Sequence, residues 1–432
     1  MTVNRMLKAL ACAYLLALLV AVLSYKAEFL ALMFATPFFG VYSVCVASYI
    51  VSRFLFSLCY RSAPDAAHEP AIAIVMPAFN EQDAIADSLR SLLELSYPQQ
   101  KLELIAVDDG STDDTLAQIE RVAREADGRV RVIDFPVNRG KRAAMAAGIR
   151  ASSAEVIVFV DSDSVVEPQA LRALVQPFAD RRIGAVCGHA DVLNLRENWL
   201  TRMQAVRYFV AFRVVKAAES VFAAVTCCSG CFSAYRREAI LPRLDWWEHQ
   251  SFLGVESTFG DDRSLTNCVL RDWRIVYERR AVSHTIVPST FRKFIVQQTR
   301  WKRSWTRESL IVSRFMFRKH PIAALFTYLS IVLPLLAPVA ALHALVWGPI
   351  VHGGTLPLVY LAGIYALAMV YALYYLLFQR EYDLVWLYGV LFVFVYLTVM
   401  LWQTYYAIFT CRTAAWGTRS AGTPVTASGG EA

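Results

Sequence analysis

Long apolar runs stand at both ends of this chain, and they constrain its fold more than any other feature. A run of about 20 apolar residues is long enough to cross a bilayer as a helix. Runs of about that length cover residues 7–24, 29–51, 322–347, 356–378 and 384–409. Because 56% of the 432 residues are hydrophobic, the chain is also too apolar for a soluble enzyme. The sequence predicts a multi-pass membrane protein with a soluble domain between two groups of membrane segments.

Cations beside the first two runs predict the orientation of the chain. Arg5 and Lys8 flank the start of this pair, and Arg53 and Arg61 follow it. Lys and Arg are enriched in cytoplasmic flanks, so both ends of the pair and the central domain are expected in the cytoplasm. Residues 1–61 are therefore assigned as two N-terminal transmembrane helices of a protein of the plasma or inner membrane.

The sequence leaves open how often the chain crosses the membrane after Pro321. Three full crossings would put the C-terminus outside the cell, so a cytoplasmic tail requires one run to be re-entrant or interfacial. Pro334 and Pro338 make the first of the three runs the expected exception. Residues 321–411 are assigned as C-terminal membrane segments, and residues 412–432 as a cytoplasmic loop with a flexible Gly- and Ser-rich tail.

The central part of the chain alternates strand and helix patterns. Buried strands are predicted at residues 71–76, 102–107, 130–135 and 156–160, with helical patterns between them. This alternation predicts an α/β fold with a mostly parallel sheet and a site at the carboxyl ends of its strands. Residues 62–290 are assigned to this domain.

Two stretches mix Arg and Lys with aromatic and aliphatic residues at helical spacing, namely residues 199–219 and 291–317. The pattern is typical of helices in the membrane interface, but amphipathic helices packed on a sheet share it. For the first stretch the two interpretations are nearly even. The second precedes an apolar run, which favours the interface, so residues 291–320 are assigned as an interface helix.

Acidic residues follow two of the predicted strands. Asp109 ends one strand, where a carboxylate can hydrogen-bond a ribose or a base edge, and Asp161 and Asp163 follow another. Two carboxylates at the end of an apolar strand are costly to bury unless a cation offsets the desolvation. Mg²⁺ or Mn²⁺ bridging a diphosphate would do so, and Asp161 and Asp163 are its predicted ligands. The alternative is that they only cap a helix.

A glycine turn and a second acidic pair complete the polar motifs. The segment Asn138–Arg142 places Lys141 before a helix, which suits a diphosphate, although a solvated turn has the same pattern. Asp262 is the candidate general base that takes a proton from an acceptor hydroxyl, with Asp261 and Arg263 orienting it. The alternative for this pair is a helix N-cap with a salt bridge.

Gln297, Arg300 and Trp301 fall within one helical turn. An amide, a guanidinium and an indole can thus converge on a diphosphate and a sugar ring. A helix that is merely buried through Trp305 and Leu310 would not explain Gln297 and Arg300.

In this order, the motifs resemble those of the processive family 2 glycosyltransferases over nearly the whole chain. The resemblance implies a GT-A domain inserted between the membrane helices, inversion at the anomeric carbon, and Asp262 as the base. It implies that UDP contacts Asp109, Lys141, Asp161, Arg300, Trp416 and Arg419. It implies that the acceptor contacts Cys228, Gly230, Gln297 and Trp301.

Within this family, two segments resemble hyaluronan synthases: Cys227–Gly230 and the gating-loop motif Trp416–Arg419. The likeness implies UDP-N-acetylglucosamine and UDP-glucuronate as donors and a growing polysaccharide that passes through the bilayer. Chitin-oligosaccharide synthases of nodulating bacteria share the size and the cysteine-rich segment, but have Glu where Asp261 stands here. The pair Cys231–Phe232 replaces the more usual Pro and Leu, so a chitin-type product stays open as the alternative.

Composition weighs against several other interpretations. The sequence carries no basic and aromatic nucleic-acid module, and the net charge of +7 suits anionic nucleotide sugars. The nine cysteines follow no secreted framework, so reduced thiols and no structural metal are expected. A membrane transporter or scaffold with a silent central domain is the alternative outside the enzymes. The sequence does not predict an oligomeric state.

Overall fold

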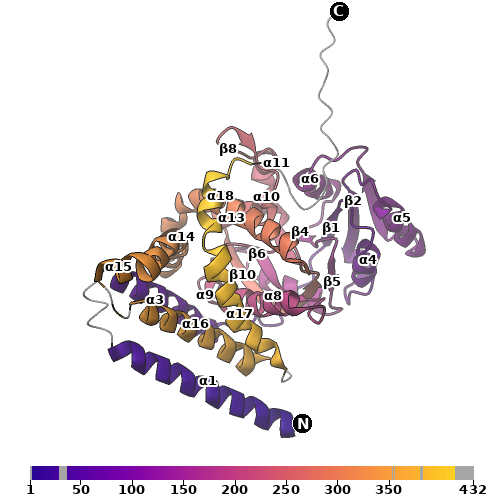
Figure 1. Cartoon of the computed structure of the whole chain (residues 1–432). Coiled ribbons are helices and arrows are strands. Elements are labelled where there is room, and N and C mark those ends of the chain that lie inside the picture. Colours follow the sequence, from indigo (N-terminus) through magenta and orange to yellow (C-terminus); the bar gives the residue numbers. More distant parts are fainter. Residues whose placement is uncertain (1, 29–36, 353, 355, 380–382, 414–432) are drawn as a thin grey trace, which may run out of the picture.

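The computed structural model describes residues 2–28, 37–352, 354, 356–379 and 383–413. An α/β domain forms one side of the molecule, and long helices from both ends of the chain gather on the other side (Figure 1). The polar site described below lies where these two parts meet.

The α/β domain is built on an eight-stranded sheet of order β3-β2-β1-β4-β7-β6-β10-β5. The strands are β1 (Ile72–Ala78), β2 (Leu102–Asp108), β3 (Val130–Asp134), β4 (Val156–Phe159), β5 (Ser164–Val166), β6 (Ile183–Val192), β7 (Ser233–Arg236) and β10 (Arg274–Thr285). Strands β1 to β4 are parallel to one another, and β6 is parallel to β10, whereas β7 and β5 are antiparallel to their neighbours. The predicted mixed, mostly parallel sheet is confirmed.

Helices cover both faces of this sheet, and β1 is therefore buried on both sides. Ala73 and Val75 face the core formed with α6 (Lys141–Ala151). Ile72, Ile74 and Met76 face the opposite core. That second core is formed with α4 (Ile85–Leu93), α5 (Thr115–Glu125) and α7 (Ala170–Val175). A strand with two buried faces is uniformly apolar, which is why β1 could be recognised in the sequence.

Smaller elements complete the domain after β7. They are α10 (Arg237–Ile240), α11 (Leu244–Glu248), the hairpin strands β8 (Ser251–Phe252) and β9 (Val255–Glu256), and α12 (Asp261–Leu270). Helix α12 begins directly at the Asp261-Asp262 pair, and its N-cap residue is Gly260.

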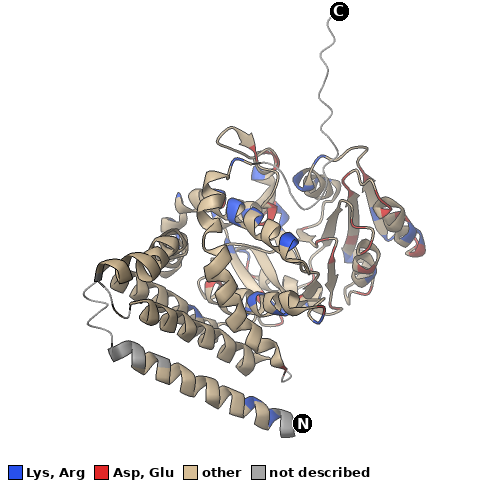
Figure 2. Ribbon diagram, viewed as in Figure 1, with Lys and Arg blue, Asp and Glu red and all other residues tan. Residues whose placement is uncertain are grey.

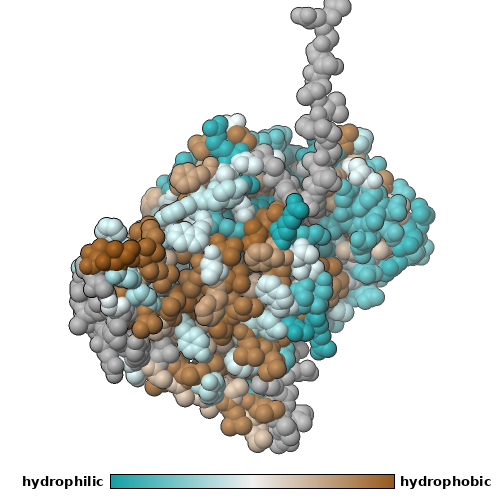
Figure 3. Space-filling model, in the orientation of Figure 1, coloured by the Kyte–Doolittle hydropathy of each residue, from teal (hydrophilic) through white to brown (hydrophobic). Residues whose placement is uncertain are grey.

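By length and composition, three helical runs of the described chain can cross a membrane: α3 (Pro37–Cys59), Pro321–Val351 and α16 (Leu356–Phe378). Charged residues are sparse on them and frequent on α4 and α5 (Figure 2). In Figure 3, hydrophobic residues gather on the side of the long helices, whereas the side of α4 and α5 is hydrophilic. Helix α1 (Thr2–Glu28), which contains the first predicted crossing, lies along α16 but is not among these three runs.

Of the three C-terminal runs, the first continues through its two prolines, and the third is bent. Helix α14 (Pro321–Leu342) continues through Pro334 and Pro338, then through a π-helical segment into α15 (Gly348–His352). The third run contains α17 (Leu387–Val395) and α18 (Gln403–Phe409), and its two parts are bent by 43° at a short break. Which of the three runs is re-entrant or interfacial stays a prediction.

The two amphipathic stretches both lie between the α/β domain and the long helices. The first forms α8 (Trp199–Val210), a π-helical segment (Ala211–Lys216) and α9 (Ala217–Val221). Helix α8 packs on β6 with one side and on α16 and α17 with another, so this stretch is a packed layer of the protein. The second forms α13 (Phe291–Ser313), which contacts α12, α14 and α18.

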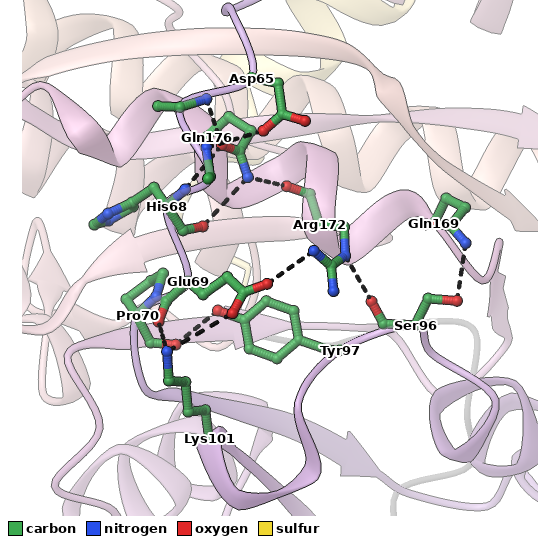
Figure 4. A network of polar contacts seen from close by, with 12 residues as sticks. Asp65, His68, Glu69, Pro70, Ser96, Tyr97, Lys101, Gln169, Arg172 and Gln176 are labelled. Atoms are coloured by element: carbon green, nitrogen blue, oxygen red, sulfur yellow. Dashed lines mark hydrogen bonds and ion pairs between the residues drawn. The ribbon is translucent and has the colours of Figure 1, made fainter.

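The linker between α3 and β1 is fixed to the domain at two places. At its start, the Tyr60 hydroxyl donates to the Tyr277 carbonyl of β10 at 2.9 Å. Further along, Gln176 accepts from the backbone of two linker residues, and Glu69 pairs with Arg172 at 2.8 Å and with Lys101 at 3.8 Å (Figure 4). Helix α3 is thereby held in place relative to the sheet.

Candidate active site

One cavity of about 1800 Å³ connects the carboxyl ends of the central strands with the space between the long helices. The predicted site residues that line it are Asp109, Lys141, Asp161, Asp163, Gly230, Asp261, Asp262, Arg263, Gln297, Arg300 and Trp301. These residues come from segments far apart in the sequence. The structure therefore brings most of the predicted motifs together around one space.

Asp109 holds the glycine turn that precedes α6. Its carboxylate accepts from the backbone N–H of Arg139 at 2.7 Å and of Gly140 at 2.9 Å, and from the Asn138 amide at 3.0 Å. Burial raises the pKa of Asp109 to about 6, although the two backbone donors oppose this rise. The turn is thus shaped by Asp109, and its shape depends on the charge of this side chain.

Lys141, the first residue of α6, reaches across to the next strand end. Its ammonium lies 2.5 Å from Asp161 Oδ1, and the charge of Asp161 helps to raise the lysine pKa. Gly230 lies against the same carboxylate, since a Cβ at this position would stand 2.8 Å from Asp161 Oδ2. A side chain at position 230 would displace the Asp161 carboxylate. The fold therefore requires glycine at this position, apart from any role in binding the acceptor.

Asp163 faces the same cavity from the turn after β4. Thr285 Oγ1, at the end of β10, donates to Asp163 Oδ1 at 3.4 Å. Among the described residues, no group of three or more His, Cys, Asp or Glu side chains could hold a metal alone. Two carboxylates fit a hard divalent cation that takes its other oxygen ligands from a bound diphosphate.

Asp262 stands in the first turn of α12, where Gly260 sets its position. Gly260 has a φ of 80°, and a Cβ there would lie 1.9 Å from Ser304 Oγ of α13. The glycine therefore allows α12 to start directly against α13. Asp262 accepts from the backbone N–H of Arg263 at 2.7 Å, and the Cys227 thiol lies 3.7 Å from its other oxygen.

Asp261 is engaged in a buried ion pair. Its Oδ1 lies 2.7 Å from Nε of Arg142, and both residues are only 5% exposed. Arg142 also donates to the Trp247 carbonyl at 2.9 Å and to Gln250 Oε1 at 2.8 Å. This pair ties α6, which follows the glycine turn, to α12, which carries Asp262. Asp261 thus fixes the position of its neighbour.

Helix α13 presents Gln297, Arg300 and Trp301 to the cavity, as their spacing predicted. The intervening Gln298 is buried, and its Oε1 accepts from Nη1 of Arg207 at 2.6 Å. The guanidinium of Arg207 also lies 5.3 Å from the centre of the Trp301 ring. Helix α8 therefore braces the helical turn that carries the predicted acceptor contacts.

Among the described residues, one predicted site residue, Cys228, does not line the cavity. Cys228 is fully buried, with its backbone N–H donating to Thr266 Oγ1 at 2.9 Å, and it does not line the cavity. The neighbouring Cys227 faces the cavity instead, so the acceptor contact predicted for Cys228 stays a prediction. Trp416 and Arg419 lie outside the described residues.

Sequence reasoning missed several cations of the site. Arg142, which pairs with the cavity residue Asp261, was seen only as part of a cationic turn. Arg207, Lys216 and Lys302, which line the cavity, were not singled out. Lys302 directly follows the Gln297–Trp301 motif, and this adjacency was the one available signal. The positions of Arg207 and Lys216 depend on how α8 packs, for which the sequence gives no local sign.

This fold, with acidic strand ends around one cavity, defines a GT-A glycosyltransferase. Residues 73–241 match the family described as Glycosyl transferase family 2. The chain is 34% identical over 408 residues to a "Hyaluronan synthase" of Streptococcus pyogenes, covering 93% of this chain and 95% of that protein. The chain thus belongs to glycosyltransferase family 2, and it is an enzyme of that class.

Two further comparisons agree with this assignment. The chain is 35% identical over 250 residues to an "N-acetylglucosaminyltransferase" of Mesorhizobium japonicum, covering 57% of this chain and 58% of that protein. Its fold is similar to that of the mannosyltransferase PcManGT from Pyrobaculum calidifontis, solved in complex with GDP-Man and Mn²⁺. That likeness has a TM-score of 0.57 at 21% identity and covers 84% of this chain and 99% of that one.

Proposed function

We propose that this chain is a processive, inverting glycosyltransferase of the plasma or inner membrane that makes hyaluronan from UDP-N-acetylglucosamine and UDP-glucuronate. One observation carries the proposal: the cavity that contains the acidic strand ends continues between the long helices. Tyr42 and Tyr49 of α3, Ala337 of α14 and Tyr371 of α16 line its far part. A polymer leaving the acceptor position has this space to enter, and the similarity to the streptococcal synthase extends over the same helices.

The proposed chemistry is one displacement at the anomeric carbon of the donor sugar. Asp262 takes the proton from the attacking acceptor hydroxyl, and the bond between the sugar and the UDP phosphate breaks as the new glycosidic bond forms. Lys141 and Arg300 stabilise the charge of the leaving UDP. Asp161 and Asp163 would hold Mg²⁺ or Mn²⁺, whose charge favours departure of the diphosphate. Trp301 offers a ring face to the acceptor sugar.

A chitin-type product is the second candidate, because the rhizobial N-acetylglucosaminyltransferase is similar to more than half of this chain. Membranes containing the protein should be incubated with labelled UDP-N-acetylglucosamine, with and without UDP-glucuronate. We expect long labelled polymer only when both donors are present, and we expect hyaluronidase to degrade it. Labelled polymer from UDP-N-acetylglucosamine alone would instead establish the chitin-type activity.

The pKa of Asp109 gives a prediction for donor binding. Burial raises this pKa to about 6, so the carboxylate gains a proton as the pH falls below that value. The protonated side chain loses acceptor capacity for the glycine turn, so UDP-N-acetylglucosamine should bind more weakly at pH 5 than at pH 7. Calorimetric titration of the purified protein measures this change.

The matched control for this measurement is Asp109→Asn. Its amide does not titrate, so the variant should bind the donor with similar, weakened affinity at both pH values. The donor itself carries a diphosphate diester, which remains ionised throughout this range. A variant that keeps the pH dependence of the wild-type protein would show that another group is responsible.

A further inference from the structure

Two cations stand in the cavity wall beyond Trp301, on the side of the long helices. Arg207 comes from α8, and Lys302 comes from α13 directly after Trp301. Phe392 and Tyr396 line the same part of the cavity. This wall thus combines two positive charges with aromatic rings.

The contacts of Arg207 hold its guanidinium beside these rings. Nη1 donates to Gln298 Oε1 at 2.6 Å. The centre of the guanidinium lies 5.3 Å from the middle of the Trp301 ring and 5.7 Å from that of Phe392. A guanidinium has five N–H donors, so most of its hydrogen-bonding capacity is left for another acceptor.

The contacts of Lys302 leave its charge uncompensated as well. Nζ donates to the Met400 carbonyl and to Thr404 Oγ1, the latter at 3.0 Å, and it lies 5.6 Å from the centre of the Tyr396 ring. All of these partners are neutral groups. Burial, and then the charge of Arg207, lower the pKa of Lys302 from 10.5 to about 8. Lys302 is therefore still positively charged at neutral pH.

No carboxylate within the described residues forms an ion pair with either cation. Keeping charges in a partly desolvated wall is costly unless an anion offsets the loss of hydration. By contrast, Lys141 in the cavity wall and the buried Arg142 that follows it each have an aspartate partner. The positive charge and the hydrogen-bond donors of the wall beyond Trp301 thus suit the binding of an anion.

We infer that Arg207 and Lys302 bind the carboxylate of a uronic acid residue in the growing polysaccharide, just beyond the acceptor position at Trp301. The inference rests on the proposed function, and it names the part of the chain that recognises the charged sugar. Arg207 can donate two parallel hydrogen bonds to a carboxylate, while Lys302 adds a point charge. The aromatic rings suit the apolar faces of the adjacent sugar rings. A product made only of N-acetylglucosamine would bring no anion to this pair.

The direct test is the binding of two tetrasaccharides to the full-length protein in detergent. The hyaluronan tetrasaccharide carries carboxylates, and the chitin tetrasaccharide has the same number of rings without charge. For Lys302→Gln we expect at least about tenfold weaker binding of the hyaluronan tetrasaccharide, because a hydrogen bond to a charged group is lost. Binding of the chitin tetrasaccharide and of UDP-N-acetylglucosamine should stay within about twofold of wild type.

Arg303→Gln is the matched control, since Arg303 is the next cation on α13 but does not line the cavity. Its Nε donates to Thr410 Oγ1 at 3.0 Å. This variant should bind both tetrasaccharides as the wild-type protein does. If Lys302→Gln and Arg303→Gln behave alike, or if both tetrasaccharides lose the same affinity, the carboxylate site is refuted.

A pH series gives a second, independent result. The groups that face Lys302 are Arg207 from α8 and Tyr396 from the π-helical segment Tyr396–Met400. As the pH rises from 7 to 9, wild-type Lys302 loses its proton and affinity for the hyaluronan tetrasaccharide should fall. Lys302→Arg should keep its affinity over this range, because arginine stays charged. A parallel fall in both proteins would contradict the inference.

The two proposals can fail separately. Polymer made by wild-type protein only in the presence of both donors supports the proposed function, whatever Lys302→Gln does. If such a wild-type protein loses no affinity on this substitution, the inference about Arg207 and Lys302 alone is wrong. If the wild-type protein makes polymer from UDP-N-acetylglucosamine alone and does not bind the charged tetrasaccharide, both proposals are wrong.

Discussion

Asp262→Asn is expected to reduce sugar transfer by roughly 10²–10⁴-fold, the usual contribution of a positioned general base. The amide keeps the shape of the side chain and can still accept from the backbone N–H of Arg263. It cannot take a proton from the acceptor hydroxyl. Donor binding should therefore stay within about twofold of wild type, while the rate of polymer formation falls. Labelled-polymer assays and calorimetric titration of the donor measure these two quantities.

Asp272→Asn serves as the control for this substitution. Asp272 follows the end of α12, where its carboxylate is 54% exposed and pairs with Arg243 at 2.7 Å, away from the cavity. Its replacement should leave polymer formation nearly unchanged. A transfer rate for Asp262→Asn within a few-fold of that control would remove Asp262 from the role of base. UDP release that survives in Asp262→Asn would favour neither glycosyltransferase product.

The second large effect is expected on stability. Asp261→Asn leaves the charge of Arg142 buried without its partner, and breaking a buried ion pair costs about 3–5 kcal/mol. The pair joins α6 to α12, so its loss should also loosen the position of Asp262. We expect a clearly lower unfolding temperature for the purified protein in detergent, measured by the intrinsic fluorescence of its tryptophans.

An exposed ion pair on the same helix provides the comparison. Arg150, also on α6, pairs with Asp245 at 2.6 Å, where the aspartate side chain is 89% exposed. Asp245→Asn should cost no more than about 1 kcal/mol, because Arg150 is partly exposed to water and keeps Glu248 as a partner at 2.7 Å. The double substitution Arg142→Met with Asp261→Leu removes both buried charges and should recover much of the lost stability. Equal unfolding temperatures for Asp261→Asn and Asp245→Asn would contradict this account.

The first half of the sheet could be predicted because its signals are local. Strands β1 to β4 are short, mostly apolar runs followed by polar residues. This pattern can be recognised in the sequence without knowing which strands lie next to one another. Strand β10 was not predicted, since it carries Arg274, Glu278 and Arg280. Glu278 is nevertheless fully buried, because Arg280 and the backbone N–H of Ala63 bind its carboxylate. Arg280 is two positions away, but Ala63 is 215 positions away, so the sequence gives no local sign that this carboxylate is buried.

The site shows the same division between local and distant information. The spacing of Gln297, Arg300 and Trp301 placed all three on one face of a helix, and the structure puts all three in the cavity wall. The sequence could not tell which of two adjacent cysteines faces the cavity, because this depends on the path of the loop before β7. The pairing of Arg142 with Asp261 also depends on packing, since 119 positions separate the two residues.

The two-point attachment of the linker between α3 and β1 limits how this molecule can move while it works. Tyr60 ties the linker to β10, and Glu69 ties it to α7. These two contacts hold the α/β domain in one orientation relative to α3, so the domain cannot rotate against this helix as a rigid body. Under the proposed function, the product would then advance by one sugar through sliding of the polymer and small local rearrangements of the cavity wall. The position of the acidic strand ends relative to the space between the long helices is thereby fixed by the fold.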